Sequence, residues 1–330
     1  MEDGQIQYQF PAEWEHHACS WLAWPHNSQT WPSNLPGAQI EFERFVRILN
    51  DAEPVKLLVA DSQKTAVEKR LSGCKNLQLV SYQTNDSWIR DFGPTFVRNP
   101  MGNSIAGVTW TYNSWGEKYP PYDLDAAAAD WIISHLGLEK IKSKLVMEGG
   151  AIETNGSGIC LTTRSCLEQR NPKWPIREIK KELTTRLGCP TVVLVEPVAI
   201  EGDDTDGHID QVARFVDKKN IVCCSSQRKQ LERTLSLPNN TNHCDAELEL
   251  HSLPKPPLIR KFGQTIPASY TNFFIANGIV VSPEFGVSTD SIAANQLREF
   301  FPGRTVIGAS SIELAVGLGS FHCLSQQQPA

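Results

Sequence analysis

A cysteine near the end of the chain has the clearest potential for covalent chemistry. Cys323 follows a glycine-rich approach within Gly317–Pro329 and precedes a run of polar residues. The backbone there can come close to a small ligand while the sulfur faces it. A cysteine beside a histidine, here His322, is also a common small apolar core residue. A nucleophilic thiol needs a base and charged partners, so the acidic clusters upstream decide between the two interpretations.

Two upstream segments place carboxylates close to glycines. Residues 85–94 contain Asp86 and Asp91, together with a tryptophan and Arg90, before a Gly-Pro turn. On an extended chain Arg90 and Asp91 would face opposite sides, so only one of them could reach a given pocket. Asp86 taken alone is more typical of a capped turn. Glu148 precedes two glycines, which would let a ligand approach the backbone closely, although such turns are common without any function.

A third segment, 201–210, combines an acidic run with a histidine. His208 and Asp210 are two residues apart, so on a strand both side chains would face the same pocket. The acidic run lacks the alternating ligands and the closing glutamate of an EF-hand calcium loop, and a solvated loop is its simplest interpretation. On a strand His322 would point away from Cys323. The sequence therefore predicts that His208 is the acid/base partner of the thiol.

Composition excludes several classes of function. The 330 residues carry a formal charge of −6 and a pI near 5.8. Nucleic-acid and anionic-membrane binding need basic clusters, whereas an acidic chain suits a small cationic ligand. No apolar stretch approaches the ~20 residues of a membrane span, and the acidic N-terminus is unlike a signal peptide, which favours a cytoplasmic protein. The nine cysteines lack a paired framework or a metal-site spacing, so we expect reduced thiols and no metal.

The apolar runs predict an α/β fold in one domain. Short runs rich in valine and isoleucine, bounded by turn residues, are typical of buried strands, and helical patterns lie between them. The predicted strands are 55–60, 77–80, 191–195, 220–224, 278–281 and 304–307, and the predicted helices are 39–50, 123–136 and 288–300. The first helix should bury Ile40, Phe45 and Leu49 on one stripe. Because no proline- or serine-rich linker divides the chain, we expect residues 1–330 to form a single domain.

Polar groups recur along the chain at intervals of 46 to 69 residues. Asp91, Glu148, His208, Asn277 and Cys323 stand at these points, and the windows around them share no residue-level identity. A ring of similar β-rich modules, each contributing one group to a central site, would produce this spacing. Chance spacing of turns in an α/β protein would produce it as well.

Six segments, in order along nearly the whole chain, resemble one enzyme family. They are Trp21–Pro25, Asn85–Pro94, Tyr112–Asp125, Glu148–Gly150, Asp204–Asp210 and Gly319–Gln327. Together they resemble the agmatine deiminases of the bacterial-type peptidylarginine deiminase family, within the guanidino-group-modifying superfamily. The resemblance implies the pentein fold, a five-bladed pseudo-symmetric α/β propeller with its site at the centre. Such a fold would explain the recurring polar groups.

The resemblance also implies catalytic roles. Cys323 would be the nucleophile, His208 the general acid/base, and Asp91 and Asp210 the clamp for the guanidinium, while Glu148 would orient His208 or the substrate. These groups would hydrolyse agmatine to N-carbamoylputrescine and ammonia through a covalent amidino-cysteine, with no cofactor. The carboxylates should raise the pKa of the Cys323 thiol, so the bound cation would have to help form the thiolate.

The far end of the substrate decides specificity among guanidines. By the same resemblance Asp204 would hold the terminal amine of agmatine, and Trp88 and Trp115 would wall its methylene chain. Family members often carry asparagine where this chain has Asp206. The alternatives are a deiminase of free arginine or peptidylarginine, an amidinotransferase, and a non-catalytic polyamine-binding protein. The sequence leaves a homo-oligomer open.

Overall fold

The computed structural model describes residues 7–32, 34–102, 104–237 and 248–330. Within them, four three-stranded sheets repeat one arrangement: the first two strands pair antiparallel, and the third pairs parallel with the second. A helical crossover precedes each third strand, as parallel neighbours require. The sheets are β4 (Thr95–Arg98), β5 (Ile105–Thr111) and β6 (Glu139–Val146); β7 (Ile152–Thr154), β8 (Ile159–Thr163) and β9 (Thr191–Val195); β10 (Ala213–Phe215), β11 (Asn220–Cys224) and β12 (Glu249–Leu253); and β15 (Phe274–Ala276), β16 (Ile279–Glu284) and β17 (Thr305–Ser310).

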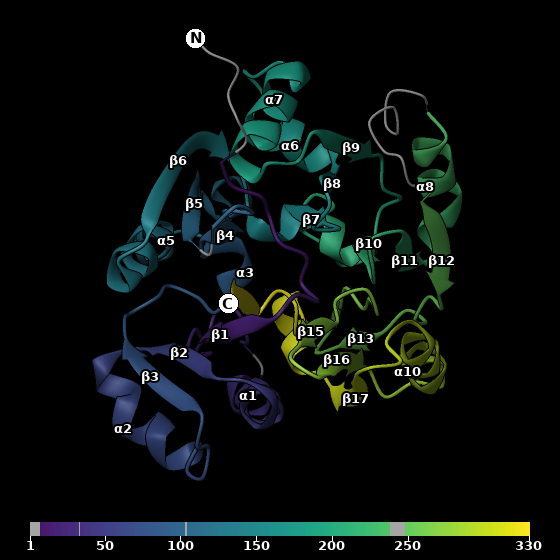
Figure 1. The fold of residues 1–330 in the computed structure, drawn as a ribbon. Coiled ribbons are helices and arrows are strands. Elements are labelled where there is room, and N and C mark those ends of the chain that lie inside the picture. The colour runs from purple at the N-terminus through teal and green to yellow at the C-terminus, as the bar shows by residue number, and fades with distance from the viewer. Residues whose placement is uncertain (1–6, 33, 103, 238–247) are drawn as a thin grey trace.

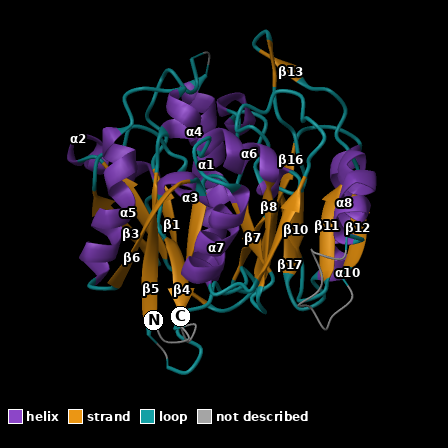
Figure 2. Ribbon diagram, turned by 90° about the horizontal axis from the view of Figure 1, so that it is seen from above, coloured by secondary structure: helices purple, strands orange, loops and turns teal. Residues whose placement is uncertain are grey.

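A further sheet joins the two ends of the chain. The last strand, β18 (Ser325–Pro329), pairs antiparallel with the first, β1 (His17–Ala23), and β2 (Val55–Val59) and β3 (Leu77–Ser81) continue the sheet in parallel. Figure 1 shows these five sheets following one another around the middle of the molecule. A hairpin of two short strands, β13 (Arg260–Lys261) and β14 (Gln264–Thr265), lies outside this pattern and projects beyond the loops (Figure 2).

Helices connect the strands and surround the sheets. The longer ones are α1 (Leu35–Ala52), α2 (Asp61–Arg70), α5 (Asp123–Leu136), α6 (Arg164–Arg170), α7 (Ile176–Leu187), α8 (Arg228–Leu235) and α10 (Thr289–Phe300). Figure 1 shows α2, α5, α7, α8 and α10 at the periphery. The Asn34 side chain caps α1 by accepting a hydrogen bond from the Gly37 amide. Gly137 and Gly188 end α5 and α7 with φ of 66° and 61°, the left-handed conformation that favours glycine.

Several single turns lie between these elements. They are the short helices α3 (Ile89–Phe92) and α4 (Ser114–Glu117) and the 3₁₀ turns η1 (Gly149–Ala151), η2 (Ile209–Gln211), η3 (Ser225–Gln227) and η4 (Leu314–Gly317). Buried apolar side chains form three clusters in the described ranges, and the largest contains both the first and the last strand regions. No helix among the described residues has the length and apolar character needed to cross a bilayer.

The structure confirms the predicted α/β class and each predicted element. The six predicted strands correspond to β2, β3, β9, β11, β16 and β17, and the three helices to α1, α5 and α10, with ends shifted by a few residues. One detail is wrong, because Ile40 is 48% exposed. The buried face of α1 passes through Ala38, Phe42 and Phe45, and Ile40 lies roughly 200° around the helix from Ala38.

Candidate active site

A cavity of about 810 Å³ lies among the loops and contains the predicted nucleophile. Its lining residues come from widely separated segments, and among them are Trp88, Asp91, Trp115, Asp204 and Cys323. The other predicted catalytic residues are fully buried. His208 and Asp210 contact the lining residues Asp91 and Cys323, and Glu148 contacts His208.

The predicted catalytic residues occupy equivalent positions in four of the sheets. Each lies in the short segment that leads into the edge strand that pairs antiparallel with its neighbour. Asp91 precedes β4, Glu148 precedes β7, His208 and Asp210 precede β10, and Cys323 precedes β18. The expectation that His208 and Asp210 share a strand is wrong, because Asp210 belongs to the 3₁₀ turn η2 and His208 precedes it. Asp91 likewise lies in the helical turn α3. Turns, and not extended segments, therefore place these side chains at the site.

Polar side chains surround the sulfur of Cys323. The Asn272 Nδ2 donates to Sγ at 3.2 Å, and Gln211 Nε2 lies 3.9 Å from it. The thiol in turn donates to Asp210 Oδ2 at 3.5 Å. Burial, followed by the nearby charges of Asp210 and Asp91, raises the pKa of Cys323 well above its ordinary 9.0. Cys323 is therefore a protonated thiol in the free protein. The pKa shift has the direction that the sequence predicts.

The carboxylate of Asp91 is held at both oxygens. Its Oδ2 accepts a hydrogen bond from Trp115 Nε1 and its Oδ1 accepts one from the Gly150 amide, each at 2.9 Å. Burial, with help from the charge of Asp210, raises the pKa of Asp91 to about 6 despite the opposing effect of His208. The indole of Trp115 thus orients an acidic group of the cavity, a contact that the sequence did not reveal.

Asp210 has one oxygen engaged and one free. His322 Nδ1 lies 2.8 Å from Oδ2 in a buried hydrogen bond, and His322 Nε2 bonds Glu13 on the ring's other side at 3.0 Å. Burial by itself raises the pKa of Asp210, but the hydrogen bond from His322 leads the effects that hold the pKa below its ordinary 3.8. Within the described part of the chain, Asp210 Oδ1 is buried without a hydrogen-bond partner.

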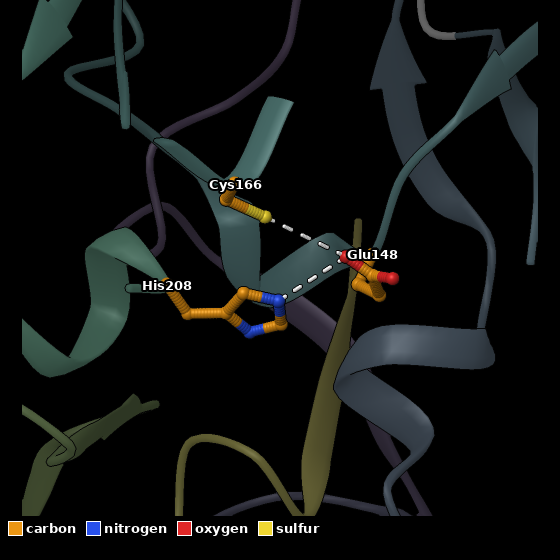
Figure 3. A group of neighbouring side chains, drawn as sticks. All are labelled: Glu148, Cys166 and His208. Atoms are coloured by element: carbon orange, nitrogen blue, oxygen red, sulfur yellow. Dashed lines mark hydrogen bonds and ion pairs between the residues drawn. The ribbon is translucent and has the colours of Figure 1, made fainter. Parts of the chain in front are cut away.

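His208 lies between two carboxylates. Its Nε2 donates to Glu148 Oε2 at 3.2 Å, and its Nδ1 lies 3.6 Å from Asp91 Oδ1 with no hydrogen bond to the described residues. Burial alone favours the neutral ring, but the Asp91 carboxylate and the contacts with Cys166 and Glu148 raise the pKa of His208 well above 6.5. Figure 3 shows Glu148, Cys166 and His208 converging, and one atom of each lies within 4.8 Å of the others.

Gly150 lies where the three acid/base groups meet. A Cβ atom on this residue would come within 2.7 Å of both Asp91 Oδ1 and His208 Nδ1, and within 3.1 Å of Asp210 Oδ2. Only glycine leaves this space free. The groups that approach Gly150 closely are side chains of the site, whereas the sequence predicts the close approach of a ligand.

The outer part of the cavity carries the group expected to read the substrate's far end. Tyr119 donates its hydroxyl to Asp204 Oδ2, and Lys118 bonds the Asp204 carbonyl oxygen. Burial raises the pKa of Asp204 above its ordinary 3.8. Trp88 is 4% exposed and tilts against Trp31, with ring centroids 5.5 Å apart. The expected carboxylate and both tryptophans therefore share one cavity.

Asp206 adopts a left-handed φ of 65°. Aspartate is one of the few residue types that tolerate this conformation. Its Oδ2 accepts hydrogen bonds from Arg170 Nη1 at 2.6 Å and Lys118 Nζ at 2.8 Å. Arg170 Nε also bonds Glu148 Oε1 at 2.8 Å. Asp206 therefore connects Lys118 and Arg170, which is the partner of Glu148, to the loop that precedes His208.

The recurring polar pattern points to the wrong asparagine. Asn277, expected at one of the recurring polar positions, instead bonds the His17 backbone and Glu53 in the turn between β15 and β16. Asn272, in the segment before β15, contacts Cys323 from the position equivalent to the other site residues. No local motif marks Asn272, and β15, the strand that it precedes, is not among the predicted strands.

Comparison with known proteins identifies the family. A family model described as Porphyromonas-type peptidyl-arginine deiminase matches residues 9–329. The chain belongs to this family. An agmatine deiminase of Medicago truncatula is 31% identical, with 98% of this chain and 96% of the relative covered. That of Ectopseudomonas mendocina is also 31% identical, with the same coverage.

Solved structures of family members have the same fold. Enterococcus faecalis agmatine deiminase superposes with a TM-score of 0.89 at 27% identity, covering 98% of this chain and 96% of that one. A cysteine-to-serine variant of C. jejuni agmatine deiminase with substrate bound gives 0.88 at 26% identity, covering 100% and 99%. A dimethylarginine dimethylaminohydrolase, at 14% identity and a TM-score of 0.57, shares the fold alone, which places the chain in the pentein class.

Proposed function

We propose that the protein hydrolyses agmatine to N-carbamoylputrescine and ammonia through a covalent intermediate on Cys323. The observation that carries this proposal is the free carboxylate oxygen beside the thiol: Asp210 Oδ1 is buried and lacks a partner in the described chain, while Asp210 Oδ2 contacts Sγ. A buried acceptor without a donor is costly, and a guanidinium supplies charge-assisted N–H donors. Full-length relatives that are agmatine deiminases support the same activity.

Asp91 and Asp210 would bind two edges of the guanidinium. The substrate is a planar, delocalised cation whose edges match carboxylates with parallel hydrogen bonds. The Trp115 and Gly150 donors orient Asp91, and His322 orients Asp210. Two oriented carboxylates would hold the central carbon in front of Sγ, which lowers the entropic part of the barrier.

The substrate's charge would complete the activation of the thiol. In the free protein the pKa of Cys323 is raised, and a bound cation opposes the carboxylates responsible for part of that shift. With the cation bound, the Cys323 thiol releases its proton to solvent and the thiolate attacks the guanidinium carbon. The tetrahedral adduct expels ammonia after His208 protonates the departing nitrogen. Water, deprotonated by His208, attacks the amidino-cysteine. Collapse of the second adduct releases the urea product and returns the proton to sulfur.

His208 is suited to the first proton transfer. Its raised pKa keeps it protonated in the free protein, and Nδ1 is the nitrogen without a hydrogen-bond partner among the described residues. Glu148 accepts from Nε2, which fixes the ring and leaves the Nδ1 proton for the leaving group.

The outer cavity favours a terminal amine over a carboxylate. Among the described residues that line the cavity, Lys118 is the one lysine or arginine. Its ammonium is already bound by the Asp206 carboxylate and the Asp204 carbonyl oxygen. Arg90 bonds Gln327 and Glu13 and is absent from that lining, so it is not placed to read a carboxylate. Asp204 would bind the agmatine ammonium, with Trp88 and Trp115 beside the methylene chain.

The five similar sheets support a five-bladed pseudo-symmetric α/β propeller as the architecture. Each sheet would be one blade, and β18 pairing with β1 would complete the blade that contains both chain ends. We propose that residues 1–330 form this single domain. A cytoplasmic location and a homo-oligomer stay predictions.

Ammonia release from agmatine, free arginine and an arginine peptide tests the proposed substrate. We expect agmatine to be turned over far faster than the other two. Intact-mass analysis of enzyme quenched during turnover should show an adduct on Cys323 and on no other thiol. Cys323→Ala should bind agmatine without releasing ammonia, and near-normal turnover by this variant would disprove the nucleophile assignment.

Asp204→Asn tests how the far end of the substrate is read. An ion pair that is partly solvated contributes about 0–1 kcal/mol and a buried one more, so KM for agmatine should rise between about threefold and about a hundredfold. The kcat should change less, because the lost contact is common to ground and transition states. Alkylguanidines without the amine should be unaffected. Equal losses for them would mean that Asp204 only supports the loop before His208.

A further inference from the structure

Cys166 is a buried thiol that the proposed deimination does not use. It lies in α6, is fully buried, and donates to Glu148 Oε2 at 3.8 Å. His208 Nε2 approaches the same oxygen at 3.2 Å. Figure 3 shows the sulfur, the ring nitrogen and the carboxylate pointing toward one another from three separate segments of the chain. A core-filling cysteine needs no such convergence, so these three atoms require an explanation of their own.

Two of the three separations between these atoms are close to the edges of a zinc site. For Zn–N and Zn–O bonds near 2.1 Å and Zn–S near 2.3 Å, tetrahedral geometry gives edges of about 3.4 Å for N···O and about 3.6 Å for S···O. The observed 3.2 and 3.8 Å lie within a few tenths of an ångström of these lengths. The three donor atoms all lie within 4.8 Å of one another, and binding would bring the third pair, Cys166 Sγ and His208 Nε2, to about 3.6 Å to complete the face of a tetrahedron.

We propose that Glu148, Cys166 and His208 form a binding site for a divalent cation of the zinc type, which inhibits the protein by occupying its acid/base histidine. Thiolate, imidazole and carboxylate are the donors that Zn²⁺ combines. Arg170 occupies Glu148 Oε1, so Oε2 is the oxygen that faces the other two donors. Binding displaces one proton from the Cys166 thiol and one from His208 Nε2, and no redox change accompanies it.

The site lies on the opposite side of His208 from the guanidinium clamp. The cation would bind Nε2, whereas Nδ1 faces Asp91 and Gly150. A bound metal would therefore leave Asp91, Asp210 and Cys323 free to bind substrate, but would prevent the doubly protonated imidazolium from forming. This consequence for the rate rests on the proposed function. Binding of the metal does not.

Cobalt binding tests the site without reference to activity. Co²⁺ is added to the full-length Cys323→Ala protein, which lacks the thiol that lines the cavity, and the thiolate-to-metal charge-transfer absorption is followed. We expect a saturable band that Zn²⁺ displaces. Adding Cys166→Ala should abolish the band and weaken Zn²⁺ binding by at least about tenfold, as loss of a supporting group alone does. Adding Cys189→Ala, which removes a buried cysteine elsewhere, should leave both unchanged.

Three outcomes would overturn the proposal. The absorption band could be absent from Cys323→Ala, or persist in the double variant that lacks Cys166. The third outcome is a band lost equally on Cys189→Ala, which would indicate a general effect on the fold. Circular dichroism spectra and melting temperatures of the metal-free variants check folding independently.

Steady-state kinetics then test the consequence for catalysis. With Cys323 intact, Zn²⁺ should lower kcat for agmatine while KM changes by less than twofold, and Cys166→Ala should relieve the inhibition relative to that variant's own metal-free rate. Inhibition that instead raises KM and persists in Cys166→Ala would place the inhibitory metal on Cys323. If cobalt binds as expected but no substrate is turned over, the metal site stands and the proposed function fails.

Discussion

The two clamp carboxylates differ in what they contribute to stability. Burial raises the pKa of Asp91 to about 6, so at neutral pH the folded protein carries a charge that the fold disfavours. The pKa of Asp210 is held below 3.8, with the His322 hydrogen bond as the leading cause. Two residues with the same proposed role therefore depend on pH in opposite ways.

Asp91→Asn should change the pH dependence of stability. Between pH 4 and 6 the native Asp91 binds a proton that the unfolded chain has lost, so stability falls as pH rises through this window. The variant has no carboxyl at this position, so its stability does not fall in this way. Its unfolding free energy minus that of wild type should therefore increase by up to about 3 kcal/mol from pH 4 to pH 7, at ~1.4 kcal/mol per pKa unit. Urea denaturation at several pH values measures this difference.

Asp210→Asn is the matched control. The pKa of Asp210 is 3.8 in the unfolded chain and lower in the folded protein, so both states are mostly ionised above pH 4. The variant's difference from wild type should therefore stay nearly constant from pH 4 to pH 7. Both variants should lose about two to four decades of activity, because a desolvated cation left unpaired on one edge costs roughly 2–5 kcal/mol. Parallel stability profiles for Asp91→Asn and wild type would mean that Asp91 is already ionised throughout this range.

At the scale of elements, single helical turns bring the site together. Asp91 lies in α3, Gly150 in η1 and Asp210 in η2, each just ahead of a first strand. Close approach of η1 to the other two turns requires the bare Cα of Gly150. The geometry of the clamp therefore depends on backbone that carries no catalytic side chain.

Gly150→Ala should reduce activity with little effect on folding. The added methyl group would lie 2.7 Å from Asp91 Oδ1 and His208 Nδ1, which forces both away from the guanidinium. Misplacement by about 1 Å costs on the order of a hundredfold in rate. Gly303→Ala is the control, since nothing lies within 4 Å of its Cβ position. Wild-type kcat/KM in Gly150→Ala would show that the turn can move aside without loss.

At the scale of the whole molecule, one N-terminal residue connects four of the sheets. Glu13 pairs with Arg214 of β10 at 2.8 Å, with Arg90 before β4 at 3.3 Å and with His322 before β18 at 3.0 Å. It also accepts the Ile275 amide of β15 at 2.8 Å. Burial alone would raise the pKa of Glu13, but Arg214 leads the charges that hold it well below 4.5. The carboxylate therefore stabilises the fold at neutral pH.

Glu13→Gln should lower the unfolding free energy by about 3–5 kcal/mol, the usual cost of leaving buried charges without their partner. Glu15→Gln, two residues away, breaks a partly exposed pair with Arg98 and should cost about 0–1 kcal/mol. Denaturant unfolding at pH 7 compares the two. The wild-type advantage over Glu13→Gln should shrink as pH falls below 4.5, because the unfolded chain's carboxyl takes up a proton there while the native carboxyl stays ionised. Equal costs for both variants would show that the buried network adds nothing beyond a surface pair.

Local sequence determined the elements and the identities of the reactive groups. Valine- and isoleucine-rich runs specified β2, β9 and β11, because burial of such runs depends on local pattern. Motifs around Asp91, His208 and Cys323 were sufficient to identify the family, since each combines a reactive side chain with turn residues. Only the tertiary structure brought in Asn272, Glu13 and Cys166, whose neighbourhoods in the chain are unremarkable. Their contacts join residues up to 309 positions apart, and no local pattern reports a contact that forms only when separate sheets pack around one centre.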